Sequence, residues 1–439
     1  MDSTLDCDVL VVGGGPAGSS SAIALAAHGW RVLQLEKDRH PRFHIGESLL
    51  PCNLPIFEKL GVLEKVRALG VTKHGADFPG EQGNYQTFHF RRALGNSPPH
   101  AFQVKREEFD QMLFDHAREC GVDAREQVKV EGIEVSGIDA VHATARAADG
   151  SPITIRARYL VDASGRDTLL GNKLKIKRKN DKHQSAAIFA HFNGVERRPG
   201  EDAGNISIYN FEFGWCWFIP LRDGVMSVGC VCWPEYLKQR KGENEAFLMS
   251  TLKRMPDAWR RMQGASMSGS VRVTGNYSYQ CSRMTGPGWI MAGDAWAFVD
   301  PVFSSGVYLA MHSGLRCADV VDSALREPAS EARMQRAFDA RIRRGVRAFS
   351  WFIYRFNSPV MRGLFAAPRN VLHLEDGVIS MLAGDVFDDA RVRLRLRMFQ
   401  VLYAIASVFT LRGWLAELRA RRTQAQSRFS GGTTPVDPA

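Results

Sequence analysis

The chain has 439 residues, of which 45% are hydrophobic and 24% are charged, and its formal net charge is +10. This length predicts two to three domains, and the composition is typical of a soluble globular protein. A basic balance favours anionic partners such as nucleotides, acidic proteins or a membrane surface. No stretch matches a nucleic-acid-binding motif, so no nucleic acid partner is expected.

The positions of the cysteines indicate the redox compartment of the protein and whether it holds a zinc site. They lie at positions 7, 52, 120, 216, 230, 232, 281 and 317, and none forms a Cys-x-x-Cys pair. This spacing argues against a disulfide framework and against a zinc site, and for a reducing cytoplasm. Residues 1–4 have neither a basic region nor a long apolar run, so no signal peptide is expected there. We therefore predict a cytoplasmic protein without a metal.

The first predicted strand, residues 8–12, runs directly into a glycine-rich loop at 13–18, and small residues follow that allow a helix to pack closely on a sheet. A second predicted strand, 31–35, ends in an acidic residue. In such a βαβ unit, loop amides and the helix dipole bind a pyrophosphate while the carboxylate accepts from a ribose hydroxyl. The pattern predicts a dinucleotide site at Gly13, Gly15, Ala17, Gly18, Glu36 and Lys37.

Two further apolar runs each end in an acidic residue with a glycine within three positions of it. The run 159–166 contains Asp162 and Gly165, and the run 289–295 contains Gly293-Asp294. Each is equally compatible with a strand followed by a capped turn. No second G-x-G-x-x-G is present, so the sequence indicates no separate NAD(P)H domain.

A strand-like segment at 214–220 reads Gly-Trp-Cys-Trp-Phe-Ile-Pro. Because side-chain direction alternates along a strand, Trp215 and Trp217 are predicted to point to the same side. Taken alone, such a pair most often reflects ordinary sheet packing. Alternation between about 180 and 280, with a turn signal at 222–224, predicts an antiparallel sheet.

The last quarter of the chain is helical in pattern and rich in arginine and aromatic residues. Residues 398–411 are largely apolar, but this run is shorter than the roughly 20 residues that a spanning helix needs. We predict a helix packed on the body of the protein, with a helix at a membrane surface or on a partner as the alternative. The tail from 426 to 439 is predicted to be disordered.

These segments resemble the flavoprotein monooxygenase superfamily and, over approximately residues 5–390, the flavin-dependent halogenases. The motifs that carry the resemblance are Gly46-Glu47-Ser48, Lys73 within 71–76, Gly214-Trp215-x-Trp217-x-Ile219-Pro220, and 300–306, which reads Asp-Pro-Val-Phe-Ser-Ser-Gly. The chain looks most similar to the branch that acts on phenols and pyrroles.

The resemblance implies an α/β fold: an FAD-binding Rossmann-like domain of the glutathione-reductase and p-hydroxybenzoate-hydroxylase type. We expect this domain at 1–330, with an inserted antiparallel sheet from about 76–104 and 180–280, and a C-terminal helical region at 331–425. Further FAD contacts implied by the resemblance are Ser48, Arg106, Asp162, Gly165, Asp294 and Gly306.

The resemblance also implies the chemistry. FADH2 from a separate flavin reductase reacts with oxygen to give a C4a-hydroperoxide, which a halide (chloride or bromide) attacks to give hypohalous acid. The amides of Ser305 and Gly306 are expected to hold the halide, although a serine at this turn also fits a plain helix cap. Lys73 directs the oxidant as an ammonium or as an amine, whereas an average lysine is simply exposed to solvent. Trp215, Trp217, Ile219 and Pro220 would form a wall between flavin and substrate.

One position departs from the tryptophan halogenases, which place a glutamate where this chain has Phe303. This favours a phenolic or pyrrolic substrate over a free indole, and leaves open whether that substrate is free or tethered to an acyl or peptidyl carrier protein. His74 is a candidate base or a structural residue. Two other functions remain open: a flavin monooxygenase or reductase without halogenation, and a flavin-bound docking protein without catalysis.

Overall fold

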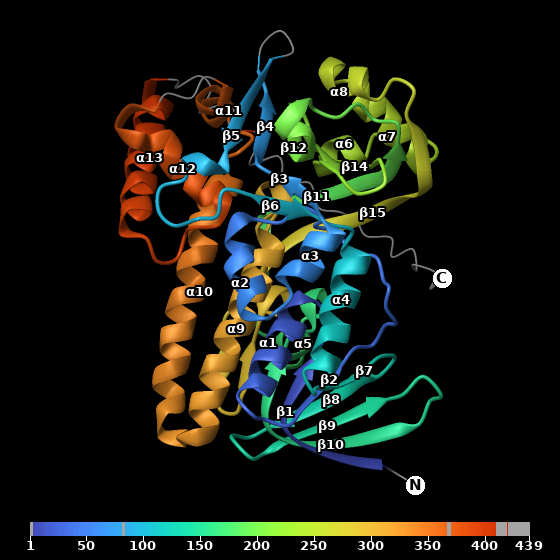
Figure 1. Ribbon diagram of the computed structural model, residues 1–439, viewed down its shortest axis with the longest axis vertical. Helices are drawn as coiled ribbons and strands as arrows, with labels where there is room; N and C mark the ends of the chain where they lie inside the picture. The colour runs from blue at the N-terminus through green and yellow to red at the C-terminus, as the bar shows by residue number, and fades with distance from the viewer. Residues whose placement is uncertain (1–2, 81–83, 367–369, 410–418, 420–439) are drawn as a thin grey trace.

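Two large sheets organise the molecule in the computed structural model, which describes residues 3–80, 84–366, 370–409 and 419 (Figure 1). The first sheet has the order β16-β17-β10-β1-β2-β7, with β9 pairing to β10 and β8 to β9. Its members β17, β10, β1, β2 and β7 run parallel. The strands are β1 (Ser3–Val12), β2 (Val32–Leu35), β7 (Asp123–Arg125), β8 (Lys129–Val135), β9 (Val141–Arg146), β10 (Pro152–Asp162), β16 (Thr285–Gly286) and β17 (Trp289–Met291).

The predicted strands at 8–12 and 159–162 fall within β1 and β10, and the strand predicted at 31–35 corresponds to β2, which begins one residue later at Val32. Their apolar runs form central parallel strands because both faces of the sheet are covered, as their complete burial shows. Helices α1 (Pro16–Ala27) and α9 (Ser305–Arg326) pack on one another. Gly314 permits their close approach, since a Cβ there would lie 2.5 Å from the Ala17 carbonyl oxygen.

The second sheet has the order β18-β15-β11-β14-β13-β12-β4-β5 and is antiparallel except between β12 and β4. The prediction of an antiparallel sheet is confirmed, although residues 101–103 belong to a separate two-stranded sheet, β3-β6. The strands are β3 (Val71–Lys73), β4 (Gly75–Pro79), β5 (Tyr85–His89), β6 (Ala101–Gln103), β11 (Lys177–Asn193), β12 (Ile206–Phe211), β13 (Gly214–Pro220), β14 (Val225–Cys232), β15 (Ser266–Cys281) and β18 (Ala297–Phe298).

Strand β13 divides its side chains between two cores. Trp215 and Trp217 pack into the main core of the molecule, and Cys216 packs into a second core on the opposite face of the sheet. The predicted alternation is therefore confirmed. The cysteine spacing argued against a disulfide framework, and the described residues contain one bonded pair: Cys216 and Cys230 lie directly opposite each other on β13 and β14. The sequence did not reveal this pair because it depends on the register of the hairpin.

Helices complete the fold. Along the left edge of Figure 1, α10 runs beside α9, and α11, α12 and α13 gather above it. One face of α13 is buried through residues such as Leu396 and Tyr403, while Val401, Ile405 and Phe409 are exposed. Within the described residues, no helix is long and apolar enough to cross a membrane. The predicted tail at 426–439 lies outside the described residues. The helices not yet given bounds are α2 (Leu54–Lys59), α3 (Leu63–Leu69), α4 (Arg106–Glu119), α5 (Leu169–Lys173), α6 (Pro234–Leu237), α7 (Asn244–Leu252), α8 (Pro256–Arg261), α10 (Glu331–Ile353), α11 (Pro359–Ala366), α12 (Leu374–Ala383) and α13 (Ala390–Phe409).

Candidate functional site

A cavity of about 850 Å³ lies where the carboxyl ends of the parallel strands face the second sheet. Its walls come from the residues that follow β1, β2, β10 and β17, and from Trp215, Trp217 and Ile219 on β13. In open parallel sheets, ligands bind at this edge because the loops that follow the strands converge there.

The glycine loop shapes one wall of the cavity. Gly13 has φ +113°, and a Cβ there would lie 2.2 Å from the Ala163 carbonyl oxygen, so only glycine fits. A Cβ on Gly15 would meet nothing nearer than an Arg42 nitrogen at 3.7 Å, which leaves the start of α1 open to a ligand. A pyrophosphate can therefore approach the amides at the start of this helix.

Glu36 lies at the end of β2 and lines the cavity. Its carboxylate accepts from the amides of Gly14 (2.7 Å) and Asp38 (3.0 Å), and from Arg42 Nη2 (3.0 Å). Burial alone would raise the pKa of Glu36, but Arg42 and these amides outweigh it and lower the pKa. Glu36 is thus an ionised acceptor at the position where a ribose would lie.

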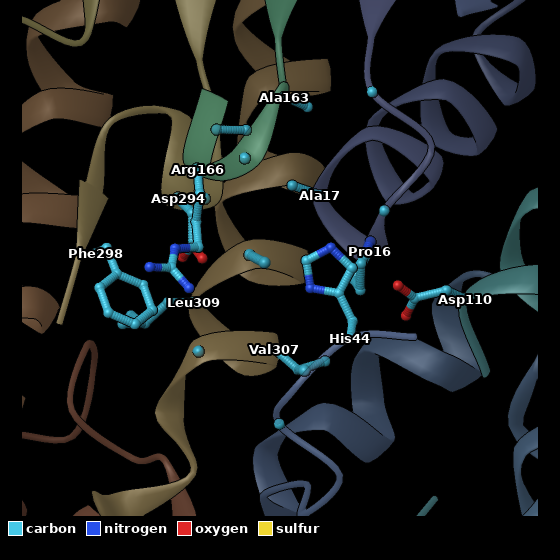
Figure 2. Close-up of a pocket in the computed structure, with 18 of the residues that line it drawn as sticks. Pro16, Ala17, His44, Asp110, Ala163, Arg166, Asp294, Phe298, Val307 and Leu309 are labelled. Carbon is cyan, nitrogen blue, oxygen red and sulfur yellow. The ribbon is translucent and has the colours of Figure 1, made fainter. Parts of the chain in front are cut away.

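Arg106 begins α4 and forms a paired contact with the buried carboxylate of Asp110, at 2.8 and 3.0 Å. Its Nη1 donates to the Ile45 carbonyl at 2.6 Å. Figure 2 shows His44 beside Pro16, Asp110 further to the right, and Arg166 beside Asp294 on the other side of the cavity. Burial raises the pKa of Asp294 to about 6, with Arg166 and Arg106 opposing that shift.

The other residues predicted to contact the cofactor divide into two groups. Lys37, Ser48, Gly165 and Gly306 line the cavity along with Ala17, and Cβ atoms added to Gly165 or Gly306 would meet nothing within 4 Å. Gly18 and Asp162 do not line it. A Cβ on Gly18 would clash with the loop itself, 2.0 Å from the Gly13 carbonyl oxygen. Asp162 is fully buried and accepts from the amides of Ser164 and Leu170, so it holds the turn that carries Gly165.

Sequence reasoning did not identify Arg42, His44 or Arg166 as part of this site. All three line the cavity. Arg42 and His44 precede the Gly46-Glu47-Ser48 motif, and Arg166 follows Gly165, so their positions beside known motifs were the available signal.

The two tryptophans form a wall between sheet and cavity. Their ring centres lie 5.8 Å apart, and each side chain is 4% exposed. Trp217 Nε1 donates to Ser227 Oγ at 3.1 Å. Gly229 makes room for Trp217, since a Cβ there would lie 2.3 Å from the ring. Trp215 and Trp217 line the cavity together with Pro301 and Ser304, in the turn at the start of α9.

That turn contains Ser304, Ser305 and Gly306. Ser304 has φ +56°, and no side chain caps the start of α9. Ser304 and Gly306 line the cavity, while Ser305 is buried, with an Oγ that lacks a hydrogen-bond partner among the described residues. Uncapped amides at a helix start carry partial positive charge, so this turn can bind an anion.

Lys73 lies one side chain behind the cavity wall. It is 2% exposed, and its Nζ donates to Ser48 Oγ at 2.9 Å and to the Leu49 carbonyl at 3.2 Å. The Nζ also lies 5.3 Å from the centre of the Phe90 ring. Burial lowers the pKa of Lys73 to about 7, with Asp77 opposing that shift. Ammonium and amine are therefore both populated at neutral pH.

Phe303 is buried in a group of aromatic rings. Its ring centre lies 5.3 Å from Phe356 and 6.5 Å from Phe365, and Phe365 in turn lies 5.1 Å from Phe78 and 5.3 Å from Phe88. Of the residues described, none forms a cluster of three metal-ligating side chains.

The residues that line the cavity fit FAD. The cavity has a glycine loop that a Cβ would close, an ionised acceptor at Glu36, and cationic side chains opposite. A model of the FAD binding domain family matches residues 6–351 of this chain.

Curated relatives are named halogenases. The chain is 35% identical to flavin-dependent halogenase armH3 of Armillaria mellea, over 74% of this chain and 69% of that protein. It is 34% identical to tryptophan 2-halogenase of Chondromyces crocatus, over 87% of this chain and 74% of the relative. It is 35% identical to the 1H-pyrrole-2-carbonyl-[peptidyl-carrier protein] brominase of Pseudoalteromonas luteoviolacea, over 72% of this chain and 78% of that protein.

Solved structures agree on the fold. A flavoprotein/dehydrogenase from Cytophaga hutchinsonii aligns with a TM-score of 0.84 and 27% identity, covering 92% of this chain and 99% of the other. A triple variant of the flavin-dependent brominase Bmp2 aligns with a TM-score of 0.80 and 30% identity, covering 91% of this chain and 99% of the other. The chain therefore belongs to the FAD-binding-domain family and, within it, to the flavin-dependent halogenases, which are FADH2-dependent oxidoreductases.

Proposed function

We propose that this enzyme halogenates an electron-rich phenolic or pyrrolic ring, free or tethered to a carrier protein, with FADH2 delivered by a separate flavin reductase. When bound, reduced FAD with oxygen supplies the oxidant that converts halide to hypohalous acid. Lys73 then positions this acid for attack by the ring, and Trp215 and Trp217 keep the ring away from the flavin.

The observation that carries the proposal is the position of Lys73. Its Nζ is in contact with Ser48, which lines the cavity, and with the Phe90 ring on another side. A hypohalous acid that leaves the flavin cavity near Ser48 can exchange one of the two hydrogen bonds that Nζ makes. As an ammonium, Lys73 donates to the oxygen of the acid and makes its halogen more electrophilic.

Halide binding is proposed at the start of α9. The amides of Ser305 and Gly306 are free of a side-chain cap, and the helix dipole favours an anion there. Asp300 fixes this turn by accepting from the Val302 amide at 3.2 Å. Trp215 and Trp217 line the same cavity as Ser304 and Gly306, so the tryptophan wall shares the cavity in which halide would be oxidised.

The substrate class rests on Phe303 and on the relatives. A buried phenylalanine at this position offers no carboxylate to an indole N–H, whereas its apolar ring suits a phenol or pyrrole. The pyrrole-carrier brominase supports a tethered pyrrole, and the tryptophan 2-halogenase is the reason to include an indole probe.

The test is product formation from FADH2, oxygen and bromide or chloride, with phenolic, pyrrolic and indolic probes. We expect wild type to halogenate a phenol or pyrrole, and Lys73→Met to lose at least about a hundredfold in product, about 3 kcal/mol of transition-state stabilisation. Lys59→Met, on an exposed face of α2, is the matched control and should retain wild-type activity. Undiminished product from Lys73→Met would refute the role of Lys73.

A second candidate is an FAD-dependent oxidoreductase without halogenation, which the similarity to the flavoprotein/dehydrogenase favours. It predicts turnover that does not depend on halide and gives either an oxygenated product or none. A third, a flavin-binding docking protein without catalysis, predicts FAD binding with no product under any halide.

A further inference from the structure

Most of the large apolar side chains that stay exposed lie on one helix. Among the described residues nine such side chains are exposed, and six of them belong to α13. These six are Leu394, Val401, Leu402, Ile405, Val408 and Phe409. Two of the other three, Val371 and Leu372, lie in a turn that packs on α12, the helix against which α13 also packs. Single exposed apolar residues are ordinary, but a gathered set of them marks a surface that contacts something else.

Helix α13 has two apolar faces. The first is a row at helical spacing that is buried against the body of the protein, and it consists of Val392, Leu396, Phe399 and Tyr403. The second is a row at spacings of seven, four and three residues with exposed fractions of 50–65%, and it consists of Leu394, Val401, Ile405 and Val408. We call this second row the exposed stripe. Packing inside the protein explains the buried row but not the exposed stripe.

The charges on α13 have one sign. Residues 390–409 include four arginines, at 391, 393, 395 and 397, and no acidic residue. Arg391 pairs with Asp389 at 2.9 Å, just before the helix. Arg393 donates to backbone carbonyls and Arg395 contacts a methionine sulfur, and neither forms an ion pair with a carboxylate among the described residues. The helix therefore carries positive charge that its described surroundings do not neutralise.

Arg397 brings this charge into the exposed stripe. It follows Leu394 by three residues and precedes Val401 by four, so it lies in the same row. Arg397 is exposed and makes no hydrogen bond or ion pair within the described part of the chain. The sequence continues this pattern, since residues 410–422 contain four more arginines and one acidic residue, Glu417.

An aliphatic stripe accompanied by arginines is the chemistry of a helix that lies flat in the boundary region of a bilayer. There the aliphatic side chains enter the acyl region, while arginine side chains extend to the lipid phosphates. We propose that α13 docks the enzyme on an anionic lipid surface through the exposed stripe and Arg397. Figure 1 shows α13 at the outer edge of the molecule, where a flat surface can reach it.

Two other occupants fit the exposed stripe less well. A second copy of the chain would bring together the arginines of two helices that have no acidic residue to pair with them, so like charges would repel. An acidic protein could meet the arginines, but protein interfaces are anchored by aromatic side chains seated in pockets. The exposed stripe is aliphatic at all four of its positions, and a lipid surface needs no matching pocket.

The test is binding of the full-length, FAD-loaded protein to sedimented vesicles, which depends neither on turnover nor on the proposed halogenation. One set of vesicles is pure phosphatidylcholine, and the other contains about a third phosphatidylglycerol. We expect wild type to bind the anionic vesicles at least about tenfold more tightly at low salt, because each arginine near an anionic surface contributes a factor of about five. Raising the salt concentration should reduce this preference.

The variants separate the apolar contact from the charge. Val401→Gln combined with Ile405→Gln removes two aliphatic side chains from the exposed stripe and should weaken binding to anionic vesicles by about tenfold. Arg397→Gln should weaken the same binding by about fivefold and leave binding to phosphatidylcholine unchanged. Val273→Gln is the matched control, because Val273 lies on β15 and is 45% exposed. All four positions are exposed, so the melting temperature and FAD content of each variant should match wild type.

Equal binding of wild type to both kinds of vesicle, or no binding to either, would overturn the proposal. Vesicle binding that survives Val401→Gln with Ile405→Gln would also overturn it, because residues outside the exposed stripe would then hold the lipid. Sedimentation velocity without vesicles tests the second copy as the occupant. If wild type self-associates and the double variant is monomeric, the exposed stripe is an interface between copies of the chain and the lipid assignment is wrong.

Discussion

Replacing Lys73 by methionine should stabilise the protein at neutral pH, although Lys73 is the residue on which activity is proposed to depend. The side chain is fully buried, and its pKa falls from 10.5 to about 7. A shift of about 3.5 units corresponds to about 5 kcal/mol of free energy that opposes folding while the unfolded lysine is charged. Methionine fills a similar volume without this penalty.

The hydrogen bonds that Lys73→Met loses offset part of this gain in stability. Nζ donates to Ser48 Oγ and to the Leu49 carbonyl, and leaving such groups without this donor costs about 1–3 kcal/mol. We therefore expect Lys73→Met to be about 2–4 kcal/mol more stable than wild type at pH 6.5. Lys59→Met, at an exposed site, should change stability by less than about 0.5 kcal/mol.

The pH dependence of the stability difference between wild type and Lys73→Met tests whether the pKa of Lys73 is lowered. Between pH 7 and 10.5 the unfolded chain keeps the proton on Lys73 and the folded chain does not. The unfolded state binds more protons there, so the stability of wild type rises with pH relative to that of Lys73→Met. The advantage of the variant should shrink by about 1.4 kcal/mol per pH unit above pH 7.

The assay is urea unfolding at pH 6.5, 7.5, 8.5 and 9.5, followed by tryptophan fluorescence, for wild type, Lys73→Met and Lys59→Met. Comparing the variants at each pH cancels the titration of other groups. A stability difference between wild type and Lys73→Met that stays constant with pH would show that Lys73 does not have a lowered pKa.

Two further predictions concern the walls of the flavin cavity. Gly229→Ala places a Cβ 2.3 Å from the Trp217 ring, so it should cost about 1–3 kcal/mol and lower the yield of halogenated product per FADH2; an unchanged melting temperature and yield would contradict this. Glu36→Gln removes the charge that Arg42 pairs with and weakens a ribose acceptor, so the Kd for FAD, measured by flavin fluorescence, should rise about tenfold. An unchanged Kd would mean that Glu36 does not contact the ribose.

Local sequence patterns predicted the parts of the fold that depend on neighbours in the chain. The run at 8–12 leads directly into the glycine loop at 13–18, and the acidic residue at 36 follows the next strand, so their spacing along the chain specifies a strand, a turn and a second strand end. The alternation of Trp215 and Trp217 follows from strand geometry in the same way.

Features that depend on strand register or on contacts between distant segments could not be predicted from the sequence. The bond between Cys216 and Cys230 needs the alignment of β13 with β14. The Asp162 motif resembled a cofactor contact, but its carboxylate is occupied by the amides of Ser164 and Leu170. Contacts between residues far apart in the chain, such as Phe78 with Phe365, build the ring group around Phe303, and no local spacing predicts them.

The central claim is that Lys73 directs hypohalous acid that is made elsewhere in the protein. The most direct measurement supplies FADH2, oxygen and bromide together with the aromatic probe and monochlorodimedone, a soluble trap for free hypohalous acid. Wild type should brominate the probe with little loss to the trap, and Lys73→Met should brominate the trap at a similar rate while leaving the probe unchanged. Loss of trap bromination along with probe bromination in Lys73→Met would contradict the account, because Lys73 would then be needed to make the oxidant.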